Sequence, residues 1–211
     1  MSTSPIVHIY IFSVNDHRFP QQRLYHAVKD YCDTCGYQVS HETLIIARTE
    51  TGKPYFPHFP QIHFSISHSG QYWSCAISDQ NIGYDLQEHE LPKNETHEDM
   101  MLRHQKMAIR FFHPLEAEFV ATDCHYNFLT VWCAREAYVK YTGQGIDKYF
   151  SEHCVIPNSA DEWYRISGNT KEIRWIAMGK VFWKSYYCNN YTLCVCTETP
   201  CTCAVISCSS P

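Results

Sequence analysis

The sequence predicts an α+β fold made of two packed subdomains, which we place at residues 1–90 and 91–211. The first half is rich in short apolar runs separated by turn residues, as expected for strands. The second half begins with helical periodicity and continues with strand-like pieces. The chain has 211 residues, of which 45% are hydrophobic and 15% aromatic, enough to form a substantial core.

Charge and hydropathy narrow the class of protein. The formal net charge of −5 provides no basic field suited to a nucleic-acid backbone. The N-terminal residues lack a charged region followed by an apolar stretch and a cleavage site, and no apolar run is long enough to cross a bilayer. We therefore expect a cytoplasmic, monomeric protein without a membrane or nucleic-acid partner.

The first half predicts one helix among several strands. Leu24, Val28 and Tyr31 follow helical spacing, which indicates a helix at about 21–33. Strands are expected at residues 6–14, 63–68, 72–78 and 82–87, with a weaker one at Thr43–Ala47.

The second half opens with residues 88–99, a charged segment that we interpret as an exposed loop. Thr96 and Asp99 resemble a capping box that starts a helix, and His113-Pro114 starts another. A longer helix at about 125–142 ends at Gly143. The remaining strand-like pieces are CVIP, EWYRIS, IRWIAMGKVFW and YTLCVCT.

Two acidic positions carry the candidate chemistry. On the helix at 125–142, Glu136 and Lys140 continue an apolar stripe through Leu129, Trp132 and Cys133. An exposed Glu–Lys pair is the structural alternative, but such a pair belongs on the polar face. On the strand at 82–87, Asp85 shares one side with Gly83 and Gln87.

A buried acid needs a partner or a cation, since desolvating its charge is costly. One carboxylate from the strand and one from the helix would make the sparse oxygen site that Mg²⁺ prefers. An Asp85 that only forms a turn at the strand end is the alternative. Nearby, Ser67 and His68 precede the turn at Gly70 and suit a phosphate, with Lys53 as an added cation. Neither a Walker A loop nor a Rossmann fingerprint is present.

Taken in order, five segments are similar to one family: GKPYF, FSISHSG, GYDLQ, RFFHPLE and WCAREAYVKYTGQG. Their order and content over residues 52–145 resemble the Sfp-type (surfactin-synthetase-activating) 4′-phosphopantetheinyl transferases. The resemblance implies two similar α+β halves around a central cleft. It also implies transfer of the phosphopantetheine arm of coenzyme A to a serine of an acyl or peptidyl carrier protein, with release of 3′,5′-adenosine bisphosphate.

The resemblance also implies roles for individual residues. Asp85 and Glu136, with Gln87, would hold Mg²⁺ (or Mn²⁺) together with the pyrophosphate. Lys140 would contact the phosphates, and Lys53, Ser67 and His68 would hold the nucleotide end of coenzyme A. Glu136 or Glu116 would accept the serine proton; the sequence leaves both open.

The chain departs from the family pattern at several places. Gln87 stands where the family usually has Glu, so one carboxylate fewer faces the metal. Arg135 replaces a frequent Lys, and His113 is expected to cap a helix. Arg23 and Lys29 are approximate candidates for the 3′-phosphate. An acidic carrier also requires a local basic or apolar patch, for which the aromatic residues near 111–119 are the candidates.

Two other functions compete with the transferase. A non-catalytic protein that binds coenzyme A would explain Gln87, although it has no need of a metal pair. A zinc module would join the CxxC of Cys32 and Cys35 to Cys201 and Cys203, but no second CxxC supports it. With no export signal, we expect most of the twelve cysteines to be free thiols.

Overall fold

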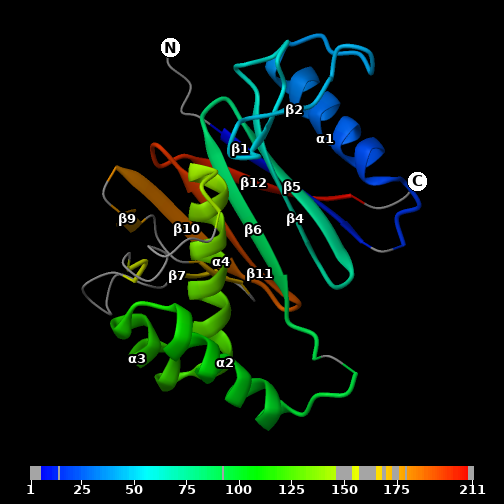
Figure 1. Cartoon of the computed structure of the whole chain (residues 1–211). Helices are drawn as coiled ribbons and strands as arrows, with labels where there is room; N and C mark the ends of the chain where they lie inside the picture. Colours follow the sequence, from blue (N-terminus) through cyan, green and yellow to red (C-terminus); the bar gives the residue numbers. More distant parts are fainter. Residues whose placement is uncertain are drawn as a thin grey trace.

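The structure is a computed structural model, which describes residues 6–13, 15–91, 93–145, 154–156, 165–167, 170–172, 176–178 and 180–208. Its helices are α1 (Pro20–Cys35), α2 (His97–Phe111), α3 (Pro114–Thr122) and α4 (Cys124–Thr142). In the part of the chain so described, no helix combines the length and the apolar character needed to cross a bilayer. Figure 1 shows α1 at one end of the molecule and α2 with α3 at the other, with the sheets and α4 between them.

The first sheet has the strand order β12-β1-β5-β4. Its strands are β1 (Ile6–Ser13), β4 (His63–Ser69), β5 (Tyr72–Ser78) and β12 (Thr202–Cys208). β1 runs parallel to β12, whereas β5 is antiparallel to both β1 and β4. β4 and β5 form a hairpin that turns at Gly70, where φ is +51°.

The second sheet has the order β6-β11-β10-β8-β7, with β9 also paired to β10. Its strands are β6 (Ile82–Glu88), β7 (Arg165–Ser167), β8 (Thr170–Glu172), β9 (Ile176–Met178), β10 (Val181–Tyr187) and β11 (Tyr191–Thr197). All these pairings are antiparallel. A small separate ladder joins β2 (Ala47–Arg48) to β3 (Pro54–Tyr55).

β1 is apolar on both faces because both faces are covered. Tyr10 and Phe12 belong to a core shared with α1, and Ile9 and Ile11 belong to a second core that joins the two sheets. Since successive side chains alternate between the faces of a strand, a strand buried on both sides requires an unbroken apolar run. A third core lies between α2, α3, α4 and the second sheet.

α4 lies against β6, β11 and β10 (Figure 1). Gly83 permits this close approach, because a Cβ atom there would lie 1.9 Å from the Ala137 carbonyl oxygen and 2.5 Å from the Tyr141 nitrogen of α4. Any other residue would push the helix away from the strand. The glycine of the segment GYDLQ therefore sets the distance between the strand that carries Asp85 and the helix that carries Glu136.

The predicted helix ends are confirmed. The hydroxyl of Thr96 accepts from the Asp99 N–H at 3.1 Å, and the Asp99 carboxylate accepts in return from the Thr96 N–H. His113 caps α3 through Nδ1, which accepts from the Leu115 N–H at 3.3 Å. Gly143 ends α4 in the left-handed conformation, with φ of +72°. The helix predicted at 21–33 is present as α1.

Two strand predictions need correction. Thr43–Ala47 is not a strand, because the Ser40 carbonyl accepts from the Thr43 and Leu44 N–H groups and turns the chain; only Ala47 enters β2. β12 was not predicted, since its alternation is broken by polar residues and its partner β1 is almost 200 residues away in the sequence.

The other strand predictions are confirmed in part. β1, β4, β5, β6 and β11 match the expected strands within one or two residues. Of EWYRIS, the structure describes the last three residues as β7, and IRWIAMGKVFW contains β9 and the start of β10. Residues 154–156 of CVIP are described and are not a strand. Position 14 and residues 157 and 162–164 lie outside the described residues.

Sheet membership crosses the boundary expected at residue 90. β6, which precedes that boundary, belongs to the sheet of the second half because it pairs with β11. β12 belongs to the sheet of the first half because it pairs with β1. The loop after residue 88 marks a change in the chain, but the sheets do not divide there.

Candidate functional site

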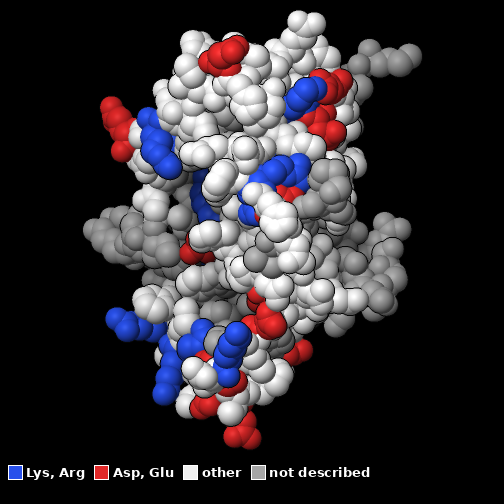
Figure 2. All heavy atoms as spheres, turned by 90° about the vertical axis from the view of Figure 1, so that its right-hand side faces the viewer, with Lys and Arg blue, Asp and Glu red and all other residues white. Residues whose placement is uncertain are grey.

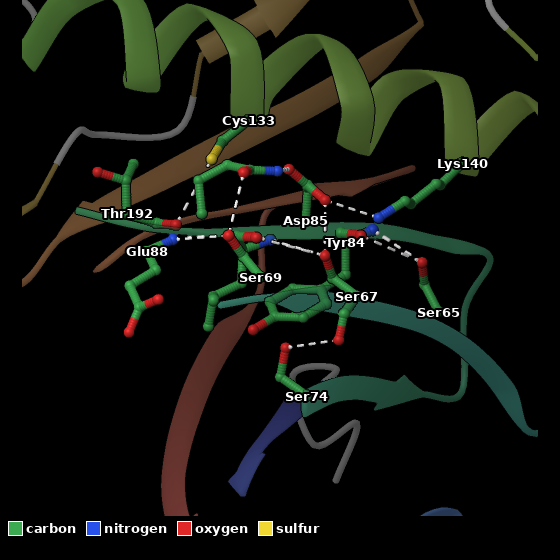
Figure 3. A network of polar contacts seen from close by, with 12 residues as sticks. Ser65, Ser67, Ser69, Ser74, Tyr84, Asp85, Glu88, Cys133, Lys140 and Thr192 are labelled. Atoms are coloured by element: carbon green, nitrogen blue, oxygen red, sulfur yellow. Dashed lines mark hydrogen bonds and ion pairs between the residues drawn. The ribbon is translucent and has the colours of Figure 1, made fainter. Parts of the chain in front are cut away.

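Asp85 is the centre of a buried polar group between β4, β6 and α4 (Figure 3). Its Oδ1 accepts from the Lys140 ammonium at 2.6 Å and from the Ser67 hydroxyl at 2.7 Å. Its Oδ2 accepts from the Gln87 amide at 3.0 Å. These contacts compensate the burial of the charge, and they bring together four of the positions singled out from the sequence.

Three serines at alternate positions of β4 hold β6 in place. Their hydroxyls accept hydrogen bonds from backbone N–H groups of β6 at 3.0–3.2 Å. The pairs, serine first, are Ser65 with Tyr84, Ser67 with Leu86 and Ser69 with Glu88. β4 and β6 are edge strands of different sheets, so these side chains replace a backbone ladder. Because the serines fix the register of β6, they also fix the position of Asp85.

The sequence interpretation included Ser67 of this set but missed Ser65 and Ser69. The signal was available in the segment FSISHS, where serine occupies every second position of a predicted strand and so faces one side. What the sequence did not give was the partner strand, because β6 pairs elsewhere through its backbone.

Glu136 lies on α4 one turn before Lys140, and the two charges of the Asp85–Lys140 pair act on it. Burial raises the pKa of Glu136 above its ordinary value, the Asp85 charge raises it further, and the Lys140 charge lowers it. Burial is the largest cause, and the Asp85 carboxylate adds to it, so the two acids are close enough to repel each other. A second cation would relieve that repulsion.

Lys53 is engaged inside the protein. Its ammonium donates to Asn81 Oδ1 at 2.6 Å, to the Tyr141 carbonyl at 2.7 Å and to the Ile82 carbonyl at 3.2 Å. Burial lowers its pKa to about 8. An ammonium has three hydrogens, and all three are used here to join the end of α4 to the start of β6. Lys53 would have to exchange these internal contacts to reach a phosphate.

Arg23 and Lys29 are also paired. Arg23 contacts Asp16, with Nε 3.4 Å from the carboxylate, and Lys29 forms an exposed pair with Asp33 at 2.6 Å, one helical turn away. Neither contacts the Asp85 group. His68, by contrast, is exposed at the end of β4, next to buried Ser67.

Glu116 lies in a separate buried pair. Its Oε2 accepts from Arg135 at 2.5 and 2.8 Å and from the His113 N–H at 2.9 Å, while Oε1 accepts from the Val155 N–H at 2.7 Å. Glu116 is therefore saturated with donors and has no exposed surface. These contacts explain its conformation fully as the cap of α3 and the partner of a buried arginine.

The cysteines do not form a cluster suited to zinc. Cys32 lies on α1 and is buried in the core, whereas Cys35, the last residue of α1, is exposed. Within the described ranges, no group of three or more His, Cys, Asp and Glu side chains is placed to hold a metal ion. The zinc hypothesis, which joined these two to Cys201 and Cys203, thus gains no support.

Comparison with known proteins finds a match over the part of the chain that contains β6 and α4. The profile of the 4′-phosphopantetheinyl transferase superfamily matches residues 81–196. A 4′-phosphopantetheinyl transferase of Bacillus subtilis is 34% identical over 102 residues, which are 46% of this chain and 40% of that protein. The transferase Sfp of Bacillus subtilis strain 168 is 31% identical over 114 residues, 52% of this chain and 46% of that one.

A third relative, the transferase gsp of Aneurinibacillus migulanus, is 29% identical over 112 residues, 51% of this chain and 42% of its own length. The chain thus matches less than half the length of each of these relatives. The family profile, however, covers more than half of the 211 residues and contains Asp85, Gln87, Glu136 and Lys140. The chain belongs to the 4′-phosphopantetheinyl transferase superfamily.

Proposed function

We propose that this protein transfers the 4′-phosphopantetheine arm of coenzyme A to a serine of an acyl or peptidyl carrier protein. The observation that carries the proposal is the partly open group of Asp85, Glu136 and Lys140, built on β6 and α4 within the stretch that matches the family. A protein that only binds coenzyme A would not need Asp85 and Glu136 close enough to interact, since two carboxylates would repel the phosphates.

The donor atoms suit Mg²⁺. Asp85 and Glu136 would supply carboxylate oxygens, which are hard ligands of the kind that Mg²⁺ prefers. Gln87 would supply its amide oxygen only after its amide turns, because Nε2 donates to Asp85 and Oε1 accepts from the Ser69 hydroxyl. The raised pKa of Glu136 points the same way, because a divalent cation would offset the repulsion from Asp85. When bound, Mg²⁺ would neutralise charge on the pyrophosphate of coenzyme A.

The residues of the chain then have separate tasks. The serine oxygen of the carrier forms a bond to the β-phosphorus, and the bond from that phosphorus to the bridging oxygen breaks, which releases 3′,5′-adenosine bisphosphate. Glu136 takes the serine proton as the general base. Lys140 stabilises the charge that develops on the leaving phosphate.

Glu116 is a poor candidate for the base. Both of its oxygens already accept hydrogen bonds, and its partner Arg135 is buried with it. Removing a proton from serine would require Glu116 to give up these donors. We therefore assign the base to Glu136.

The nucleotide end of coenzyme A would meet exposed His68 and Lys140. Ser67 acts indirectly, since its hydroxyl donates to Asp85 and accepts from Leu86. Arg23 and Lys53 already have internal partners, so we do not assign them to the ligand.

The outer face of α2 is our candidate for the carrier-binding surface. A hollow of about 330 Å³ lies there, lined among others by Leu102, Lys106, Arg110 and Phe111. Figure 2 shows several Lys and Arg side chains, with acidic ones between them, at the lower end of the molecule, where Figure 1 places α2 and α3. Cationic and exposed apolar side chains together complement an acidic partner.

Intact mass spectrometry tests the reaction. A panel of apo carrier proteins is incubated with this protein and coenzyme A, with Mg²⁺ or with EDTA. We expect a gain of one phosphopantetheine on at least one carrier, and EDTA should abolish it. If coenzyme A binds but no carrier gains mass under any condition, the binding-protein hypothesis replaces this proposal.

The carrier surface has its own test. Lys106→Glu should raise the KM for the carrier roughly tenfold and leave the KM for coenzyme A unchanged. Lys93→Glu, an exposed lysine outside the hollow, serves as the matched control. Equal effects of the two variants would show that only net charge matters and that α2 is not the docking surface.

A further inference from the structure

Cys133 is a thiol that lies directly beside the candidate site. It belongs to α4, three residues before Glu136, and its side chain points from the helix toward the strands below (Figure 3). The residue is fully buried. In the sequence it continues the apolar stripe of α4, and a buried cysteine often acts only as a small apolar side chain. The proposed reaction gives this thiol no task.

The thiol has one hydrogen and two acceptors within reach. Its Sγ donates to the Thr192 carbonyl of β11 at 3.4 Å, and it is also within hydrogen-bonding reach of the Asp85 carboxylate. Both acceptors belong to the ladder of β6 and β11, in which Thr192 stands opposite Gln87. Rotation about the Cβ–Sγ bond would move the hydrogen from the carbonyl to the carboxylate without moving the sulfur.

Asp85 loses donors when a ligand enters the site. Lys140 would leave Oδ1 to contact a phosphate, and Gln87 would leave Oδ2 when its amide turns toward the metal. Of the three donors described for Asp85, Ser67 alone would then remain. A buried carboxylate that lacks donors is costly, and one that rotates freely loses entropy when it binds a cation. The site therefore needs a donor that takes no part in ligand binding.

We propose that Cys133 is a positioning residue for Asp85, whose thiol turns from the Thr192 carbonyl to the carboxylate as Lys140 and Gln87 turn to the ligand. The inference rests on the proposed function, which supplies that ligand. The exchange is favourable because a hydrogen bond to a charged acceptor is stronger than one to a neutral carbonyl. Cys133 touches neither coenzyme A nor the metal; it holds the carboxylate in the orientation that the metal requires.

Cys194 provides a matched control. It is a second fully buried thiol in the same core, and it stands opposite Asp85 in the ladder of β6 and β11. Its Sγ donates to the Val195 carbonyl at 3.8 Å. Removing the Cys194 thiol thus creates a similar loss of packing near Asp85 without removing the proposed donor.

Calorimetry of coenzyme A binding, with Mg²⁺ or with EDTA, tests the inference without any transfer step. Alanine and serine are similar in size, but only serine keeps a donor. The affinity gained from Mg²⁺ should fall about fivefold in Cys133→Ala and should change by less than about twofold in Cys133→Ser. Cys194→Ala should also change it by less than about twofold.

A further variant covers the case in which Cys133→Ala does not fold. Cys133→Val lacks a donor but leaves no cavity, so it should weaken binding as Cys133→Ala does. Unchanged affinity in either donor-free variant, or equal losses in Cys133→Ser and Cys133→Ala, would overturn the inference. If the unaltered protein binds coenzyme A no better with Mg²⁺ than with EDTA, the metal-dependent proposed function fails instead.

Discussion

α4 makes two ion pairs, five residues apart, that differ in how far they are closed off from solvent. Arg135 and Glu116 are closed off, with side chains 2% and 0% exposed. Lys140 and Asp85 are partly open, because the lysine side chain is 29% exposed and the aspartate 3%. The closed pair has no room for a ligand and serves the fold. The open pair can exchange its internal contacts for those of a ligand, which is what a reaction centre requires.

The two pairs also differ in how their acids are satisfied. Glu116 receives two backbone N–H donors besides the guanidinium, so the protein alone compensates its burial. In the described part of the chain, the donors to Asp85 are side chains, among them Ser67, Gln87 and Lys140. Side chains change rotamers more easily than backbone does, so the second arrangement can be rearranged at small cost. Buried charge alone therefore does not identify a catalytic acid; the kind of partner does.

The largest expected effect is on turnover at the open pair. Glu136→Gln removes the base and a metal ligand, so transfer to a carrier should fall at least about 100-fold. Its thermal midpoint should stay the same or rise, because the variant no longer buries a charge beside Asp85. Turnover and unfolding are measured on the same sample. Unchanged turnover would remove Glu136 from the site.

The next largest effect is on stability at the closed pair. Glu116→Gln leaves Arg135 buried without its counter-charge, which should lower the free energy of unfolding by about 3–5 kcal/mol. Denaturant unfolding gives this value, and activity per folded molecule should stay within about threefold. The double variant with Arg135→Met should recover part of the loss. A stable Glu116→Gln protein without activity would instead make Glu116 the base.

Lys53 sharpens the comparison, since it is a third internal cation but pairs with neutral oxygens. Lys53→Met removes three hydrogen bonds that join α4 to β6, and should cost about 1–3 kcal/mol of stability. Lys29→Met, in an exposed pair, should cause no measurable change. Binding of 3′,5′-adenosine bisphosphate should be unaffected by Lys53→Met. A large loss of that affinity would return Lys53 to the nucleotide site.

The stability lost in Lys53→Met should depend on pH, because folding lowers the pKa of Lys53. Folding lowers the pKa of Lys53 from 10.5 to about 8, so the unfolded chain binds more protons than the folded one between these values. The stability of the unaltered protein should therefore rise relative to Lys53→Met as pH increases from 8 toward 10.5. His63 and Cys196, which interact with Lys53, titrate in both proteins. A gap that narrows over this range would mean that the pKa is not lowered.

The smallest effect concerns the metal requirement of the open pair. Gln87→Glu replaces the amide that donates to Asp85 with a second charge. The variant should need several-fold less Mg²⁺ for half-maximal transfer and should gain more thermal stability from added Mg²⁺. Titrations of both proteins give the comparison. An unmoved Mg²⁺ requirement would place position 87 outside the metal site.

Local patterns predicted much of this structure. The helix caps at Thr96, His113 and Gly143 depend on neighbours within three or four residues, and the alternation along β6 placed Asp85 and Gln87 on one side. Such features can be predicted because the residues that interact to form them lie close together in the sequence.

What could not be predicted depends on distant partners. The sequence did not show that Lys53 would meet Tyr141, 88 residues away, or that Glu116 would be enclosed by Arg135. The sequence suggested Lys53 for the ligand and Glu116 as one candidate base. Residue types alone do not reveal which charged side chains are paired inside the folded protein. The same reason explains why the parallel strand β12 was missed.

The most direct test of the account compares two aspartate variants in the mass assay. Asp85→Asn removes the centre of the open pair, while Asp79→Asn changes an exposed aspartate on the preceding turn. With coenzyme A, Mg²⁺ and a responsive apo carrier, we expect full conversion by the unaltered protein and by Asp79→Asn, and none by folded Asp85→Asn. Conversion by Asp85→Asn at the unaltered rate would contradict the assignment of the reaction centre to the Asp85–Lys140 pair.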